Sequence, residues 1–267
     1  SISEEVPVKG TCRRMNRPLW LDDTTLIFYA RFCNRPSGFY LHHTDEQHTE
    51  HAYEVILSED VHYSLSADRS SLFYSRYHTD PFYDNLFRGD LHELETGSFN
   101  SRRITHDQRL FSPQTAGERI FALQTEGQHQ ILTETDPHIE SVIRRWETED
   151  DASVIQIAPN PTRHDELALI GRRNGVQGIW FESNEPDEPL FSRSPDIAFH
   201  RGSIFDMYWH PDGDRMLFVS DHTGVMNVYE YHTTRESVTQ ITESLYNAFE
   251  ASYSPDGSSI AYIRQTG

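Results

Sequence analysis

Six times along the chain, an apolar segment runs into a short turn and then into a second apolar segment. The clearest copies are residues 208–213 (YWHPDG) followed by 215–220 (RMLFVS), and residues 252–257 (SYSPDG) followed by 259–264 (SIAYIR). Weaker copies turn at residues 21–23, 66–68, 112–114 and 158–160, and the aligned turn positions 22, 67, 113, 159, 211 and 255 are spaced by 45, 46, 46, 52 and 44 residues. A fixed period of about 40–50 residues, with several short strands in each unit, is typical of a β-propeller.

Each unit has room for four strands. In the second unit the candidates are residues 61–66, 71–76, 86–92 and 101–105, and in the fifth they are 204–210, 215–220, 225–230 and 237–241. Runs rich in Phe, Tyr, Val and Ile between Asp, Gly, Pro and Ser favour strands. The Pro-Asp-Gly turns suit a strand corner because proline presets φ, aspartate bonds the backbone ahead of it, and glycine accepts a positive φ. The segment 137–147 fits a helix or an outer strand, and its place as a fourth strand favours the strand.

These patterns predict an all-β fold, a single β-propeller of five to six four-stranded blades with an incomplete last blade. The units lie near 13–57, 61–105, 107–145, 153–192, 204–241 and 248–267. The residues that precede the turns are expected in the innermost strands; they are Trp20, Tyr63, Phe111, Ile157, Trp209 and Tyr253. The chain stops after the second strand of the sixth unit, so either residues such as 5–9 add a strand there or the chain is a fragment or domain of a longer protein. The second interpretation is favoured, because one added strand would still leave the blade short.

Charge and composition narrow the possible partners. The net charge of -19 argues against general nucleic-acid binding, which depends on neutralising phosphates. No segment is apolar over the length that a membrane span needs. Lys9 is the sole lysine beside 22 arginines, a bias that fits either halophilic adaptation or the codon preference of a GC-rich genome.

The charge imbalance predicts that salt stabilises the protein. Repulsion among 42 acidic groups against 23 basic ones is screened at high ionic strength. We expect a higher melting temperature in molar potassium chloride than in dilute buffer, measured by thermal melts at both concentrations. A melting temperature that stays the same or falls with salt would leave codon preference as the explanation for the missing lysines.

The repeats resemble those of the TolB-like family of WD-like propellers, whose unit runs from an apolar strand into Ser-Pro-Asp-Gly. The match is close at residues 254–257 and 210–213 and partial at 66–69, and only the proline remains at 158–160 and 112–114. The resemblance covers nearly the whole chain and implies a periplasmic or extracytoplasmic protein that holds a partner on one face of the disk. Similar propellers also precede the catalytic domain of prolyl-oligopeptidase-type enzymes, and a related family of oligogalacturonate lyases uses a histidine-bound metal.

The sequence contains no recognisable catalytic motif. A Gly-x-Ser-x-Gly elbow, a His-Glu-x-x-His pair and a glycine-rich phosphate loop are all missing. Cys12 and Cys33 lie in or beside the first unit and could form a disulfide or remain thiols. No cofactor and no catalytic residue are therefore predicted within the chain.

A histidine cluster is the weak candidate for a metal site. It lies in a segment that resembles a polar exposed loop, and its members are His42, His43, His48 and His51. Imidazoles and the neighbouring carboxylates suit zinc or a similar divalent ion, but the spacing matches no standard site, so a solvated loop is favoured.

The ends of the second strands carry a more systematic signal. The aligned residues there are Arg31, Arg76, Gln124, Arg172, Asp221 and Arg264. We expect the four arginines on one face of the disk, opposite the Pro-Asp-Gly turns. They either pair with carboxylates of adjacent blades or form a docking ring for an acidic peptide, a chain terminus or an anionic saccharide. The loop 76–85 beside them adds further candidate contacts, namely Tyr77, His78, Phe82 and Tyr83.

The sequence is compatible with three functions. The first is a non-enzymatic TolB-like module of the cell envelope that binds a protein, a peptide or another ligand. The second is the regulatory propeller of a prolyl-oligopeptidase-type peptidase whose catalytic domain lies outside the chain. The third is a metal-dependent polysaccharide lyase.

Overall fold

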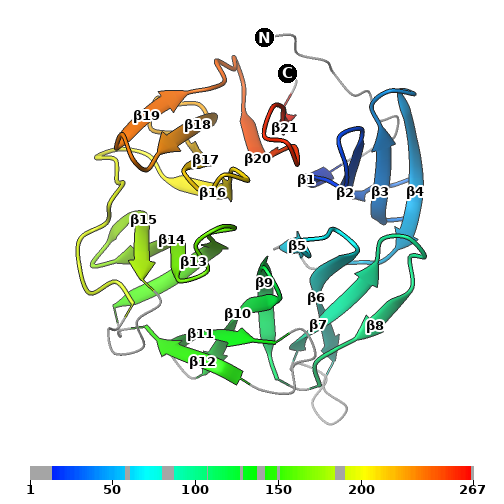
Figure 1. The fold of residues 1–267 in the computed structure, drawn as a ribbon, viewed down its shortest axis with the longest axis horizontal. Coiled ribbons are helices and arrows are strands. Elements are labelled where there is room, and N and C mark those ends of the chain that lie inside the picture. Colours follow the sequence, from blue (N-terminus) through cyan, green and yellow to red (C-terminus); the bar gives the residue numbers. More distant parts are fainter. Residues whose placement is uncertain are drawn as a thin grey trace.

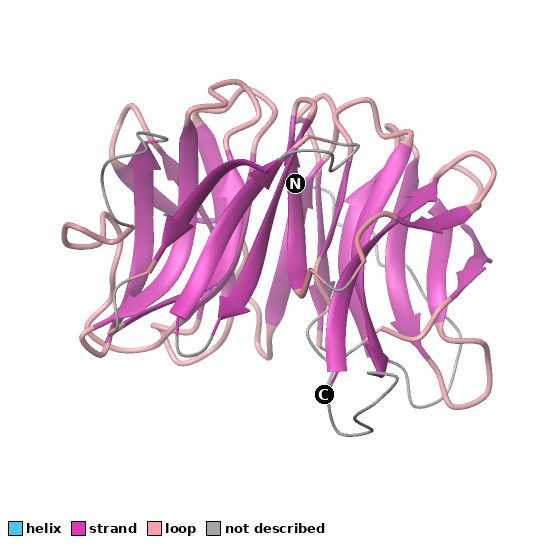
Figure 2. Cartoon of the chain, turned by 90° about the horizontal axis from the view of Figure 1, so that it is seen from below, coloured by secondary structure: helices cyan, strands magenta, loops and turns pink. Residues whose placement is uncertain are grey.

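The chain forms a ring of radially arranged sheets around a central axis (Figure 1). The structure is a computed structural model, and it describes residues 14–57, 61–79, 87–106, 108–126, 129–136, 142–148, 151–183 and 190–265. Every regular element in this part of the chain is a strand, and the loops gather at the two ends of the disk (Figure 2). The predicted all-β propeller is confirmed.

Six sheets form the blades, and each is a run of consecutive antiparallel strands. Blade 1 contains β1 (Arg14–Trp20), β2 (Thr25–Arg31), β3 (Gly38–His43) and β4 (His48–Glu54). Blade 2 contains β5 (Tyr63–Leu65), β6 (Ser71–Thr79), β7 (Phe87–Glu95) and β8 (Ser101–Arg103). Blade 3 contains β9 (Leu110–Ala116), β10 (Arg119–Glu126), β11 (His129–Thr135) and β12 (Val142–Glu147), so the favoured strand near residues 137–147 is confirmed for its described part.

Of the other three blades, two have fewer than four described strands. Blade 4 contains β13 (Ala152–Pro159), β14 (Glu166–Arg173) and β15 (Val176–Ser183). Blade 5 contains β16 (Ile204–Trp209), β17 (Arg215–Ser220), β18 (Asn227–His232) and β19 (Ser237–Gln240). Blade 6 contains β20 (Ala248–Tyr253) and β21 (Ile260–Arg264), and so it is the incomplete blade that the sequence predicts.

The first strand of each blade lies nearest the axis (Figure 1). All six residues expected in these strands are found there, in β1, β5, β9, β13, β16 and β20. Five of these strands, all but β5, contain an irregularity in their pairing with the second strand. Such bulges bend a strand and increase its local twist, which suits the crowded centre of a ring.

The turn chemistry inferred from the repeat is present in five of the six blades. Asp22, Asp68, Asp212 and Asp256 each accept a hydrogen bond from a backbone N–H two residues ahead, and Asn160 does the same from Thr162. Hydrogen bonds from Ser254 and Ser258 lower the pKa of Asp256 to about 2. The side chain therefore closes the corner between the first and second strands, as expected for an Asx-type turn.

The turn of the third unit is a correction. Residues 112–114 were predicted to form it, but they lie inside β9, and the chain turns at Gly117 and Glu118. Ser112 has a φ of 52° and precedes Pro113 at the irregularity in β9. Arg17, with a φ of 46°, precedes Pro18 in the same way in β1. In both strands the proline marks the bulge near the axis rather than the turn.

Apolar side chains fill the spaces between neighbouring blades. One cluster joins blades 1 and 2 through Tyr29, Phe39, Tyr63, Leu72 and Tyr74. Comparable clusters join blades 3 and 4, blades 4 and 5, and blades 5 and 6, while a smaller one joins blades 2 and 3. Five of the six pairs of neighbouring blades are therefore joined by apolar clusters, while blades 6 and 1 are connected by hydrogen bonds of Asn16, Arg17 and Ser252. The described residues include no helix of the length and apolarity that crossing a membrane requires.

A buried ion pair connects blades that are far apart in sequence. Arg17 donates to Asp206 at 2.7 Å, and its backbone N–H donates to Glu250 at 2.5 Å. Asn16 also donates to Glu250, at 3.1 Å. These contacts link the innermost strands of blades 1, 5 and 6 at the point where the ring closes.

Candidate functional site: a basic crevice between blades 1 and 2

The four predicted arginines lie at the end of the disk opposite the first turns. Arg31 and Arg264 are the last residues of β2 and β21, and Arg76 and Arg172 lie near the ends of β6 and β14. Each first turn joins the innermost strand to the second strand, so the far end of the second strand must lie at the other face of the disk. Their placement on that face agrees with the sequence-based expectation.

The arginines do not share one orientation, because the first turns differ in length. In blade 1 the turn is closed by a bond from Leu21 N–H to Thr25 O, four residues apart, and in blade 2 by a bond from Ser66 N–H to Ser71 O, five residues apart. A shift of one residue places the following side chains on the opposite face of a strand. Arg31 is therefore out of phase with Arg76.

This shift brings Arg31 and Arg76 into the same crevice. Arg31 lies on the face of β2 that carries Tyr29, and Arg76 lies on the face of β6 that carries Tyr74. Tyr29 and Tyr74 belong to the cluster between blades 1 and 2, so the two arginines extend the facing surfaces of these blades toward the open end.

Arg172 and Arg264 lie in other crevices. Arg172 shares its face of β14 with Ile170, which packs against blade 5. Arg264 shares its face of β21 with Tyr262, which packs against blade 5 from the other side. The structure thus divides the predicted ring among three crevices and leaves the one between blades 1 and 2 with two of its members.

Four residues that the sequence did not single out complete the crevice. Asp90 stands opposite Arg76 in the pairing of β6 with β7, and it is fully buried. It accepts hydrogen bonds from Arg103 at 2.5 Å and from the Thr105 hydroxyl at 3.0 Å. His92 lies one step further along the same face, opposite Tyr74. These residues come from β7, β8 and the segment after β8, whereas the aligned arginines all come from the second strands of the blades.

His78 and His92 form a stacked pair in this crevice. Their Nε2 atoms are 3.1 Å apart, their ring centroids are 5.4 Å apart, and the ring of Tyr74 also stacks with that of His92, with centroids 5.3 Å apart. Burial lowers the pKa of His92 to about 4, assisted by the nearby His78, Arg76 and Arg103. His92 is therefore neutral at pH 7, and one imidazole of the pair donates while the other accepts.

Among the described residues, the charge balance of the crevice is positive. The guanidinium of Arg31 donates to the carbonyl oxygen of Leu57 at 2.6 Å, and the side chain of Arg76 is exposed. Within the described part of the chain neither arginine forms an ion pair with a carboxylate, and Asp90 is already bound to Arg103. An arginine held by a carbonyl keeps its charge, and exposed guanidinium N–H groups fit a carboxylate. The arrangement suits an anion.

The predicted contacts beside Arg76 are only partly in a loop. Tyr77 and His78 belong to β6, which runs three residues beyond Arg76, to Thr79. His78 faces blade 1 with Arg76, whereas Tyr77 faces blade 3 and is 41% exposed. Phe82 and Tyr83 lie outside the described residues.

The histidine cluster of blade 1 is a hairpin rather than a loop, which corrects the sequence interpretation. His42 and His43 end β3, while His48 and His51 lie in β4. His43 stands opposite His48 on one face, and His42 is opposite Thr49 on the other, so the four imidazoles do not converge. Among the residues that the structure describes, no group of three or more His, Cys, Asp or Glu side chains is arranged to hold a metal ion. Cys33 is exposed, and Cys12 lies outside the described residues.

A second repeated residue pair in the sequence could have located Asp90. The Thr105 hydroxyl binds Asp90 and the Leu91 N–H, and the Thr242 hydroxyl binds Asn227 and the Val228 N–H in the same way. In both blades the threonine follows the Asp or Asn by 15 residues. This second repeated pair locates the third strand and the buried carboxylate of blade 2.

Comparison with known proteins supports the fold alone. Sequence comparison finds no matching family model and no matching curated protein. Among solved structures, the protein from Agrobacterium tumefaciens assigned as TolB matches with a TM-score of 0.63 and 14% identity, over 96% of this chain and 92% of that one. An oligogalacturonate lyase in complex with manganese matches with a TM-score of 0.56 and 15% identity, over 92% and 70% of the two chains. The β-propeller domain of the Trilobed protease from Pyrococcus furiosus matches with a TM-score of 0.56 and 8% identity, over 90% and 88%. The TolB-like resemblance of the fold is therefore supported, whereas the functions of these proteins differ.

Proposed function

We propose that this propeller is a non-enzymatic binding module of the cell envelope that holds an acidic segment of a partner protein. The segment binds in the crevice between blades 1 and 2. The observation that carries the proposal is the pair formed by Arg31 and Arg76, two guanidinium groups without a carboxylate partner among the described residues of a protein with a net charge of -19.

The chemistry of the crevice supports an acidic protein segment. Two guanidinium groups on facing blades match two carboxylate oxygens, and such bonds are about twice as strong as neutral ones. The stacked His78 and His92 beside them offer ring faces and polar nitrogens to a peptide backbone or side chain. The rigid strands that carry these groups reduce the ordering cost of binding.

The fold comparisons support a propeller module, and its proposed place outside the cytoplasm rests on the TolB-like resemblance of the repeats. TolB-like proteins share the architecture of this chain over most of its length. A propeller domain of a protease also shares it. The alternative is a role in controlling access to a peptidase active site, and an α/β-hydrolase segment in the same gene would identify that role.

Charge reversal in the crevice tests the proposal. We expect the double variant Arg31→Glu/Arg76→Glu to weaken binding of a glutamate-rich peptide by at least about a hundredfold, since each charged hydrogen bond contributes about 1.5–3 kcal/mol. Binding is measured by calorimetry with the peptide and with its glutamine counterpart, at two salt concentrations.

The matched control is the double variant Arg172→Glu/Arg264→Glu. It changes the net charge by the same amount but lies in the other two crevices, so it is expected to weaken binding far less. Equal losses in the two double variants would show a long-range charge effect and contradict a specific site. Failure of the unaltered protein to prefer the glutamate peptide over the glutamine peptide would contradict the proposed function.

A further inference from the structure

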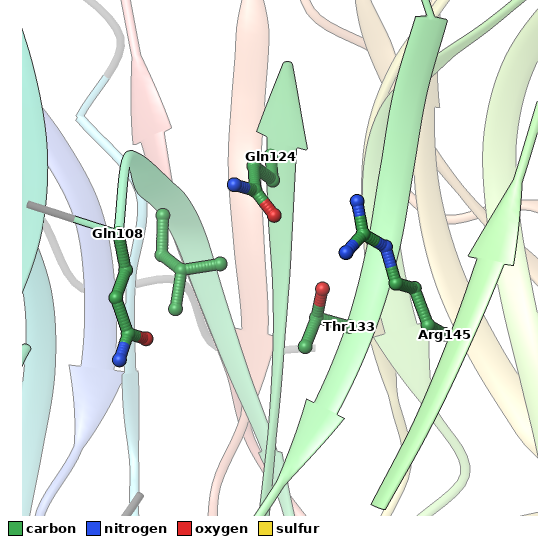
Figure 3. Close-up of a pocket in the computed structure, with 5 residues that line it drawn as sticks. Gln108, Gln124, Thr133 and Arg145 are labelled. Atoms are coloured by element: carbon green, nitrogen blue, oxygen red, sulfur yellow. The ribbon is translucent and has the colours of Figure 1, made fainter. Parts of the chain in front are cut away.

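A small pocket opens on the other side of blade 2. Its lining side chains come from one face of blade 3, namely Gln108, Leu110, Gln124, Thr133 and Arg145, and its volume is about 170 Å³ (Figure 3). Leu110 pairs with Gln124, and Thr133 pairs with Arg145, so these four residues stand on neighbouring strands of the same sheet.

The pocket lies on the face of blade 3 that is turned toward blade 2. Leu110 belongs to the small cluster in which blade 3 packs on Phe73 and Leu91 of blade 2. A Cβ atom added to Gly89 would lie 3.0 Å from the carbonyl oxygen of Leu110 and 3.6 Å from the ring of Tyr77. Tyr77 therefore stands beside the pocket. Leu110 begins β9 and Gln124 lies near the end of β10, so the pocket is at the same end of the disk as Arg31 and Arg76.

The exposed surface of the pocket is mostly apolar, and the few polar groups around it suit the carboxylate end of a side chain. Figure 3 shows the side chains of Gln124, Thr133 and Arg145 around one space, with Gln108 at its other side. The Thr133 hydroxyl is buried and has no hydrogen-bond partner in the described part of the protein. The guanidinium of Arg145 bonds Glu126 at 2.8 Å and has further N–H groups to donate. The described lining residues thus offer one cation, which is shared with Glu126, a hydroxyl and two amides, and none of them is acidic.

The size of the pocket limits the ligand to a single side chain. Sites for complete small molecules usually enclose about 300–1,000 Å³. About 170 Å³ is close to the volume of a cavity that takes one benzene ring. A glutamate side chain fits this space, with its methylene groups against Leu110 and its carboxylate toward Thr133 and Arg145.

We propose that this pocket takes a second carboxylate of the acidic segment that binds between blades 1 and 2; the inference rests on that proposed function. The two sites lie on either side of one sheet, and neighbouring sheets are about 10 Å apart. An extended peptide advances about 3.3 Å for each residue. The two acidic residues of the partner are therefore three or four positions apart, and the exposed ring of Tyr77 contacts the backbone between them.

A peptide series tests the spacing. Each peptide carries two glutamates separated by one to seven positions in an otherwise neutral sequence, and a companion peptide carries a single glutamate. The unaltered protein is expected to bind the peptides with a spacing of three or four about tenfold more tightly than the single-glutamate peptide. Other spacings are expected to add little.

Pocket variants separate this inference from the proposed function. Thr133→Val keeps the shape and removes the hydroxyl, and Arg145→Gln removes the charge; each is expected to abolish the advantage of the second glutamate while binding of the single-glutamate peptide is retained. Arg144→Gln, the neighbouring arginine on the other face of β12, is the control, and thermal melts verify the folding of every variant.

Two outcomes would overturn the inference in different ways. A spacing series without a maximum at three or four, or pocket variants that keep the full advantage, would contradict the second subsite and leave the crevice intact. Failure of every glutamate peptide to bind would contradict the proposed function as well.

Discussion

Replacing Arg17 with methionine is expected to lower the free energy of unfolding by about 3–5 kcal/mol at pH 7. Arg17 is buried, and it supplies the counter-charge for Asp206 and Glu250. Removing one partner of a buried ion pair leaves an uncompensated charge, which costs more than the pair contributes. Because these contacts join blades 1, 5 and 6, the loss is expected in the cooperative unfolding of the whole ring, measured by urea denaturation.

The stability that Arg17→Met loses is expected to increase as the pH rises. Burial raises the pKa of Glu250, and the nearby charge of Asp206 raises it further, while Arg17 opposes both. Without Arg17 the folded-state pKa of Glu250 moves further above its unfolded value. The folded protein then binds a proton more tightly than the unfolded chain, so stability is present at low pH and falls as the pH rises through the folded-state pKa.

The methionine variant is therefore expected to lose less stability near pH 4.5 than at pH 7. Adding Glu250→Gln to Arg17→Met should recover part of the loss at pH 7, because one buried charge is removed. A loss of the same size at both pH values would contradict the electrostatic account and indicate a packing defect. The Asp23→Asn variant, altered at an exposed turn residue, serves as a control for general pH effects.

The repeat was sufficient to predict the fold because its information is local. Each Asp or Asn turn is closed by the bonds of its own side chain, and the aromatic residues before the turns lie in the innermost strands as expected. The predicted turn of the third unit was wrong, also for a local reason. Proline restricts φ both at a turn and after a left-handed residue in a bulge, and Pro113 serves the second role.

The candidate site was less predictable because it depends on the phase of each strand. The alignment of Arg31 with Arg76 ignored one residue of turn length, and that residue decides which neighbouring blade a side chain faces. The neighbours of Arg76 in the crevice come from other strands. Their separation from Arg76 in the sequence does not indicate that they lie close to it. Asp90 and Arg103 therefore emerged only from the pairing of β6, β7 and β8.

The histidine-rich segment illustrates a different limit. A polar run such as 42–51 has the composition of a loop, yet it forms the outer hairpin of blade 1 because β4 lies at the edge of the sheet. Edge strands are solvated on one side and do not require the alternation of apolar residues that marks a buried strand. Composition alone does not distinguish a polar loop from a solvated edge strand.

Replacing Gly257 with alanine is expected to destabilise the propeller by about 2–5 kcal/mol. Gly257 has a φ of 72°, and a Cβ atom there would lie 2.0 Å from Nε2 of His210 in the adjacent turn. His210 is buried and held by Asp212 at 2.9 Å, so it has little room to move. The left-handed backbone costs about 1–2 kcal/mol for alanine, and the forced contact between blades 5 and 6 adds about 1–3 kcal/mol.

Gly175→Ala is the matched control for the backbone term. Gly175 has a φ of 77°, and no described atom lies within 4 Å of the position that a Cβ atom would take there, so alanine is expected to cost only the left-handed strain. A double-mutant cycle with His210→Ala measures the contact itself, since the shortened side chain removes the clash. We expect the cost of Gly257→Ala to fall toward that of Gly175→Ala in the His210→Ala background. A cost that is the same in both backgrounds would show that the packing of adjacent turns does not set the requirement for glycine in the Pro-Asp-Gly motif.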